Sequence, residues 1–255
     1  MKANTLIELE CFQDLNKYKY IHPFYQTNRG HLIISSDLKS QNDYILGYIL
    51  RRIPSQYSNR DVKILMYSNH INESQYPKLS KYFKKPIVTT RDDLMSLLLW
   101  VKKTMDHRYN LFRELKAKDI FTFNEKVAKQ EINKRFIPYL LLIIHELPVT
   151  DDIKNDPSID LIHQIILKSR AAGIHVIATS STIINSISPV FKHNMDGIIS
   201  KVDTIEKSKL LVGSDEAMKI KSNEVMVHEC LTGKNSIYIL FDEPEKRPLL
   251  HVEHL

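Results

Sequence analysis

The sequence predicts an α/β protein of three layers, in which helices cover both faces of a mostly parallel central sheet. Short apolar runs of strand length alternate along the chain with segments whose apolar residues recur every three or four positions. The run at residues 139–144, YLLLII, is apolar at every position, as is typical of a strand buried on both faces. Near the C-terminus, two further runs flank CLTGKN, which predicts an antiparallel hairpin.

The strands are expected where these apolar runs occur. They are placed at residues 6–10, 31–35, 62–68, 139–146, 174–180 and 196–200, with the hairpin strands at 224–229 and 236–241. Because the carboxyl ends of parallel strands share one edge of a sheet, the loops after residues 35, 68, 146 and 180 should line that edge. A ligand of this protein is therefore expected there.

Two helices stand out between the strands. The first is predicted at residues 92–116, where one stripe carries Leu94, Leu98, Val101, Met105, Tyr109 and Phe112. The second is predicted at residues 158–172, with Leu161, Ile162, Ile165 and Ser169 facing inward. Gly173 follows as its stop, since glycine is the usual residue just after a helix.

Composition sets the limits on function. A chain of 255 residues with 43% hydrophobic residues can bury a sizeable core, and we expect one domain over residues 1–255. No apolar run approaches the ~20 residues that a membrane span needs. The net charge of +6 is spread along the chain, so nucleic acid is not an expected partner. Cys11 and Cys230 match no metal or redox spacing.

The stretch HLIISSDLKSQNDYILGYIL, residues 31–50, has the outline of a phosphate-binding unit without its residues. An apolar run leads into a polar loop and then a helix-like segment, which is where a P-loop protein carries G-x-x-x-x-G-K-[ST]. Here the eight places read Ser36, Asp37, Leu38, Lys39, Ser40, Gln41, Asn42 and Asp43. The segment is either an ordinary loop or a nucleotide site that has lost its chemistry.

Two stretches resemble the FtsK/SpoIIIE-type ATPases. Residues 168–182, KSRAAGIHVIATSST, are similar to that family's R-A-A-G-I-H-L-V-L-A-T-Q-R-P. The predicted helix also matches the family's W-x4-M-x2-R-Y spacing, with Trp100, Met105, Arg108 and Tyr109. Asn124 lies where the family has the asparagine of its following Y-N. The resemblance extends over about residues 25–240 and implies a RecA-like P-loop NTPase fold. It also implies that the strands at 31–35 and 139–146 are the Walker strands, which we expect side by side.

The resemblance assigns positions of a nucleotide site to this sequence. Ser36 and Gln41 occupy the positions of the two P-loop glycines, Asn42 that of the lysine and Asp43 that of the Mg²⁺-binding Ser/Thr. His145 occupies the position of the metal-facing acid and Glu146 that of the general base. Each lost hydrogen bond to a charged group costs about 1.5–3 kcal/mol. Lys39 could replace the lysine from a shifted position, and His145 with Glu146 could form a metal or acid/base pair instead of a structural one. The favoured hypothesis is a degenerate site with no catalytic residue, no metal, and absent or weak binding of ATP and Mg²⁺.

The resemblance also implies a setting. FtsK/SpoIIIE-type domains power DNA translocation, and in type VII secretion they sit in tandem on a membrane-anchored protein. This sequence resembles the C-terminal, third ATPase-like domain of secretion ATPases of the EssC kind. We therefore expect a non-hydrolysing cytoplasmic domain of a membrane-anchored ATPase, acting in substrate recognition, regulation or assembly. Its expected partners are neighbouring ATPase domains and secreted substrates, and a hexamer of the parent is one assembly that the family allows. The alternatives are an accessory domain of a DNA translocase and a divergent active ATPase.

A candidate partner surface lies on the helix at 92–116. Helical geometry places Leu99 nearly opposite the main apolar stripe, and Trp100 lies to one side of it. These two side chains either form an exposed patch for a protein partner or show that the helix is covered on two sides.

Overall fold

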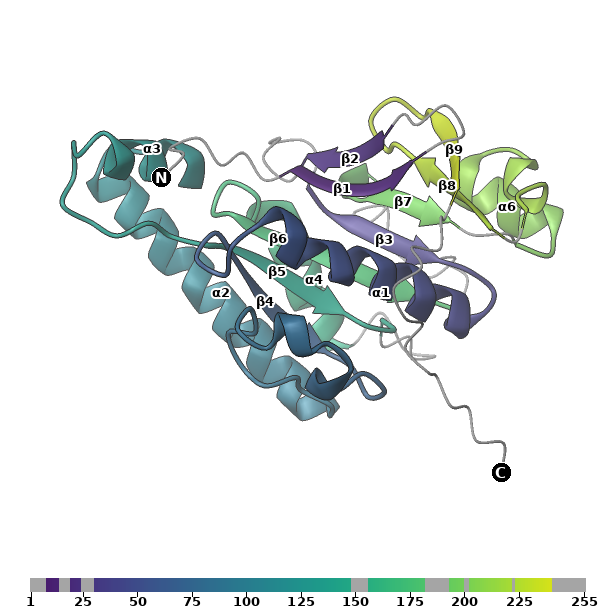
Figure 1. Cartoon of the computed structure of the whole chain (residues 1–255), viewed down its shortest axis with the longest axis horizontal. Coiled ribbons are helices and arrows are strands. Elements are labelled where there is room, and N and C mark those ends of the chain that lie inside the picture. Colours follow the sequence, from purple (N-terminus) through teal and green to yellow (C-terminus); the bar gives the residue numbers. More distant parts are fainter. Residues whose placement is uncertain are drawn as a thin grey trace.

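The computed structural model describes residues 8–13, 19–23, 30–147, 156–181, 193–199, 202–221 and 223–239. Its strands form one nine-stranded sheet in the order β2-β1-β9-β8-β7-β3-β6-β5-β4 (Figure 1). The strands are β1 (Glu8–Gln13), β2 (Lys19–Pro23), β3 (Leu32–Ser35), β4 (Val62–Tyr67), β5 (Tyr139–Ile144), β6 (Ile174–Ser180), β7 (Asp196–Ile199), β8 (Glu224–His228) and β9 (Asn235–Ile239). The five strands from β7 to β4 run parallel, and the other four pair antiparallel. The mostly parallel sheet and the hairpin are confirmed.

Strand β6 lies between β3 and β5, so the prediction that the two Walker-type strands lie side by side is wrong. On one side Ile33 of β3 pairs with Ala178, and on the other Leu142 of β5 pairs with Val176. All residues of β6 are buried, as expected for a strand in the middle of a sheet that is covered on both faces. The carboxyl end of β6 therefore separates the ends of β3 and β5.

Helices cover both faces of the sheet, which confirms the three layers. Helix α1 (Lys39–Gln56) packs on one face, and in Figure 1 it crosses the face nearest the viewer. Helices α2 (Arg91–Glu114) and α4 (Pro157–Lys168) pack on the other face. Successive residues of a strand point to opposite faces, so Leu141 joins the α1 core and Leu142 joins the α2 and α4 core. The shorter helices are α3 (Ile120–Ala128) and α6 (Ile205–Val212).

The predicted helices are present with small changes at their ends. Helix α2 buries every residue of its predicted stripe except Tyr109, which is half-buried. Helix α4 ends at Lys168, and Gly173 takes a φ of +70° in the turn before β6. The first predicted strand is β1, shifted to Glu8–Gln13, and β2 had no counterpart in the sequence analysis. Across the described residues, no helix combines the length and apolarity that a membrane crossing requires.

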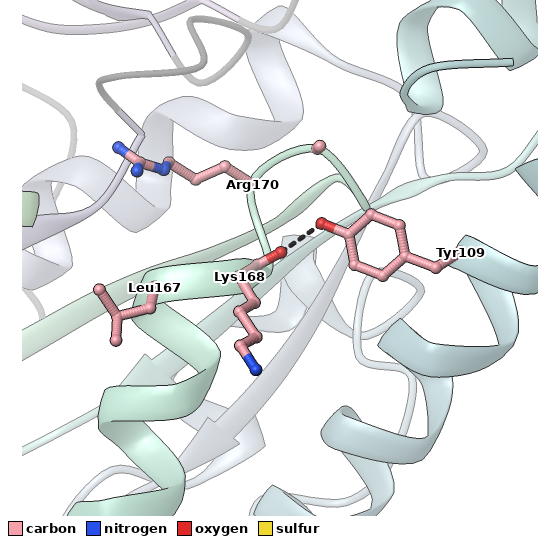
Figure 2. Close-up of a pocket in the computed structure, with 5 residues that line it drawn as sticks. Tyr109, Leu167, Lys168 and Arg170 are labelled. Atoms are coloured by element: carbon pink, nitrogen blue, oxygen red, sulfur yellow. Dashed lines mark hydrogen bonds between the residues drawn. The ribbon is translucent and has the colours of Figure 1, made fainter.

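The residues that resemble the FtsK/SpoIIIE family hold the amino ends of β5 and β6. The buried guanidinium of Arg108 donates to the carbonyl oxygens of Ala172 at 2.7 Å and Pro138 at 2.8 Å. The Tyr109 hydroxyl donates to the carbonyl of Lys168 beside a shallow hollow (Figure 2). These contacts join α2 to the turn between α4 and β6, at the edge of the sheet opposite the expected ligand edge.

Candidate functional site

The loop that follows β3 is short because helix α1 begins inside the stretch expected to hold a phosphate. Only residues 36–38 separate the end of β3 from the first residue of α1, Lys39. The backbone N–H groups of Gln41 and Asn42 donate to the carbonyl of Leu38, at 3.0 and 3.4 Å. A P-loop presents such N–H groups to the phosphates. In this chain they are used to form the first helical turn.

Asn42, at the position of the P-loop lysine, is fully buried and bonded within the protein. Its side-chain oxygen lies 2.9 Å from the Ser36 hydroxyl, which donates to it. Its side-chain nitrogen donates to Oε1 of Glu146 at 3.2 Å. A neutral amide thus links the start of the loop to the end of β5, in a place where a P-loop protein has a positive charge.

Glu146 follows β5 with a φ of +58°, and its carboxylate accepts four hydrogen bonds. Oε1 accepts from the Asn42 amide at 3.2 Å and from the Thr179 hydroxyl at 2.9 Å. Oε2 accepts from the N–H and the hydroxyl of Ser181, at 2.9 and 2.6 Å. Burial raises the pKa of Glu146, but these hydrogen bonds outweigh it and hold the pKa below its usual value. Its roughly four acceptor positions are therefore filled, which leaves a weak base.

His145, at the position of the metal-facing acid, is fully buried between Asp43 and Ser68. Its Nε2 lies 2.5 Å from Oδ1 of Asp43, and its Nδ1 lies 2.8 Å from the Ser68 hydroxyl. The Ser68 oxygen accepts from the backbone N–H of Ile71 at 2.9 Å, so its own proton can point to Nδ1. In the tautomer with its hydrogen on Nε2, His145 donates to the Asp43 carboxylate and accepts from the Ser68 hydroxyl at Nδ1.

These contacts make one group, the strand-end network, which consists of Ser36, Asn42, Asp43, Ser68, His145, Glu146, Thr179 and Ser181. It contains five of the seven predicted site residues. Lys39 lies in the first turn of α1 and is only partly buried, and Gln41 contributes its backbone to that turn. Ser68, Thr179 and Ser181 were not among the predicted site residues, although Ser68 and Ser181 directly follow strands whose ends were expected at this edge.

A separate ion cluster joins the loop to α6. Oδ1 of Asp37 lies 2.7 Å from Nζ of Lys207, and Oδ2 accepts from the backbone N–H of Asp203 at 2.7 Å. Lys207 also pairs with the Asp203 carboxylate at 2.8 Å. The negative charge of Asp37 is thus already balanced inside the protein. This contact was not predicted from the sequence, because the residues are far apart in the chain.

The candidate partner surface on α2 has one exposed apolar residue. Leu99 is 52% exposed, as its position opposite the stripe predicted. Trp100 is half-buried, and Nζ of Lys85 lies 5.0 Å from the centre of its ring. The exposure of Leu99 agrees with a contact surface, while the role of the two residues stays a prediction.

No group of three or more His, Cys, Asp or Glu side chains that could hold a metal ion occurs in the described part of the chain. At the network, the two positions that would face Mg²⁺ are occupied by Asp43 and His145, which bond to each other. Mg²⁺ prefers oxygen ligands in an octahedral arrangement, and an imidazole does not suit it. The residues present therefore do not fit the metal of a P-loop site.

Comparison with known proteins identifies the family of this chain. The family model described as the FtsK/SpoIIIE family matches residues 55–198. The chain belongs to the FtsK/SpoIIIE family. A DNA translocase FtsK of Borreliella burgdorferi is 27% identical over 208 residues, which are 79% of this chain and 26% of that protein. This chain thus spans about a quarter of the length of that relative.

Solved structures of the same fold include type VII secretion proteins. The cytoplasmic domain of the type VII secretion ATPase EccC of Thermomonospora curvata superposes with a TM-score of 0.74 at 12% identity, over 94% of this chain and 29% of that one. ATPases 2 and 3 of EssC from Geobacillus thermodenitrificans superpose with a TM-score of 0.71 at 13% identity, over 96% and 47%. These likenesses confirm the RecA-like P-loop fold that the family resemblance implied.

Proposed function

We propose that this chain is a non-hydrolysing FtsK/SpoIIIE-type domain of a type VII secretion motor. It acts through a surface, in substrate recognition, regulation or assembly, and not through a reaction. The observation that carries the proposal is the strand-end network, in which the residues at nucleotide-binding positions bond to one another. The fold that it shares with EccC and EssC supports the secretion setting.

Three features of the site argue against turnover. The first turn of α1 occupies the place of the phosphate-binding loop. The Asp43–His145 pair does not fit Mg²⁺, which P-loop enzymes need to neutralise the developing charge on the phosphates. Glu146 is saturated with hydrogen bonds and has a lowered pKa, so it would be a poor base for activating water. We assign no catalytic residue to this chain.

The purified chain is expected to show no Mg²⁺-dependent ATP hydrolysis above the background of a blank preparation. A phosphate-release assay checks this, with Glu146→Gln as the matched variant. Because the general-base position is altered in that variant, any activity that survives it comes from a contaminant. Mg²⁺-dependent turnover that disappears in Glu146→Gln would instead support a divergent active ATPase.

The setting follows from the same proposal. The domain would be a cytoplasmic part of a membrane-anchored parent that carries neighbouring active ATPase domains and exports protein substrates. The FtsK relative supports a second candidate, an accessory domain of a DNA translocase. Submicromolar retention of duplex DNA at physiological salt, with a steep salt dependence, would favour that candidate.

The Leu99→Asp variant should fold normally and reduce secretion of the parent system's substrates. Leu99 is 52% exposed, and substitutions at such positions usually change the free energy of unfolding by no more than about 0.5 kcal/mol. The measurement is secreted substrate per cell, beside the melting temperature of the isolated chain. Asn110→Asp is the matched control, since it adds one negative charge at another exposed position of α2. Normal secretion by a folded Leu99→Asp variant would remove this surface from the proposal.

A further inference from the structure

In a P-loop protein, the bound nucleotide and Mg²⁺ join two parts of the fold. The lysine of the loop contacts the β- and γ-phosphates, and the loop Ser/Thr and the Walker B acid hold the metal. The ligand therefore connects the start of the helix after the first strand to the end of the Walker B strand. In this chain the corresponding residues are Asn42 and Asp43 of α1, and His145 and Glu146 after β5.

Here these two parts are joined directly by side chains. Oδ1 of Asp43 lies 2.5 Å from Nε2 of His145, and the Asn42 amide donates to Glu146 at 3.2 Å. The partners are 102 and 104 residues apart in the chain, so each contact closes a long-range link. We call these two contacts the α1–β5 brace.

Further hydrogen bonds orient the His145 and Glu146 side chains of the brace. The Ser68 hydroxyl, just after β4, fixes the other nitrogen of His145 at 2.8 Å. The Ser181 hydroxyl, just after β6, fixes Glu146 at 2.6 Å. The brace thus connects α1 to the ends of three neighbouring strands. His145 is fully buried and the Asp43 side chain is 23% exposed, so their interaction is screened less than one between surface charges.

We propose that the α1–β5 brace replaces nucleotide and Mg²⁺ in joining α1 to β5, so that this domain keeps one conformation whether or not ATP is present. The inference rests on the proposed function in one respect, because it assumes that nucleotide does not displace the brace. Its consequence is regulatory: the domain presents the same surface to its partners throughout the ATP cycle of neighbouring domains.

A double-mutant cycle in urea tests the brace with Asp43→Ala, His145→Ala and the combined variant. Each single change should lower the folding equilibrium constant by about tenfold or more, since it leaves a partly or fully buried partner unpaired. The combined variant should be at least about fivefold more stable than the product of the two single effects predicts. The exposed pair Asp215 and Lys219, whose charged atoms lie 2.8 Å apart, is the matched control. The effects of the two single substitutions at this control pair on the folding equilibrium constant should multiply to the effect of the combined variant, to within about twofold. Effects at Asp43 and His145 that multiply in the same way would overturn the brace.

If either alanine variant does not fold, Asp43→Leu and His145→Leu complete the cycle, because they preserve more of the side-chain volume and cannot form the hydrogen bond. Amide hydrogen exchange of residues 39–56 and 139–147 in the unmodified chain supplies the second measurement. Exchange should be unchanged by millimolar Mg·ATP, and slowing of either segment would contradict the independence from nucleotide. If the two single effects on the folding equilibrium constant simply multiply and no ATP is hydrolysed, the brace proposal is wrong while the proposed function stands. If the chain hydrolyses ATP and the double-mutant cycle shows coupling, the proposed function is wrong and the brace remains only a structural link.

Discussion

The Gly173→Ala variant should lose about 2–5 kcal/mol of the free energy of unfolding. Gly173 has a φ of +70°, and a residue with a Cβ pays roughly 1–2 kcal/mol in that region. Its Cβ would also lie 2.4 Å from Cδ1 of Ile120, and such overpacking costs about 1–3 kcal/mol. The loss is measured by urea denaturation.

Gly213→Ala separates the two contributions. Gly213 has a similar φ of +76°, but a Cβ there would meet no atom within 4 Å. It should therefore show only the conformational cost of about 1–2 kcal/mol. In an Ile120→Ala background, which removes the two nearest atoms, Cδ1 and Cγ2, the cost of Gly173→Ala should fall close to that of Gly213→Ala. Equal losses for both glycines in the unmodified chain would contradict the clash with Ile120.

The second expected result is a loss of stability in acid through His175. This residue is fully buried, and burial lowers its pKa to about 3. The unfolded chain binds this proton at a pKa of about 6.5. Between these values the unfolded state holds more protons, so His175 contributes full stability above about pH 6.5 and loses it as the pH falls. The expected slope from this one group is about 1.4 kcal/mol per pH unit between pH 6 and pH 4.

Urea denaturation at a series of pH values measures this slope. In His175→Gln the contribution of the imidazole is absent, so the slope between pH 6 and pH 4 should be smaller by that amount. His107→Gln is the matched control, because it makes the same substitution at an exposed position of α2. The same slope in His175→Gln and in the unmodified chain would show that His175 does not titrate in this way.

The sequence by itself determined the layers and the family. Apolar runs such as residues 139–144 report burial on both faces of a strand, and the periodic stripe of residues 92–116 reports a helix with one buried side. Both are local properties of the chain. The same geometry placed Leu99 on the outside of α2, where it is 52% exposed. The rule that the carboxyl ends of parallel strands share an edge also located the candidate site.

Only the tertiary structure decided how that site is built. No local pattern places β6 between β3 and β5, because strand order depends on which edges pair after the chain has folded. The sequence likewise could not show that Asp43 and His145, 102 residues apart, meet at 2.5 Å. Hydrogen bonds need donor and acceptor within about 3 Å, and that distance is set by the packing of whole elements, not by neighbouring residues. The residues of the site were therefore visible in the sequence, while their bonds to one another were decided by the fold.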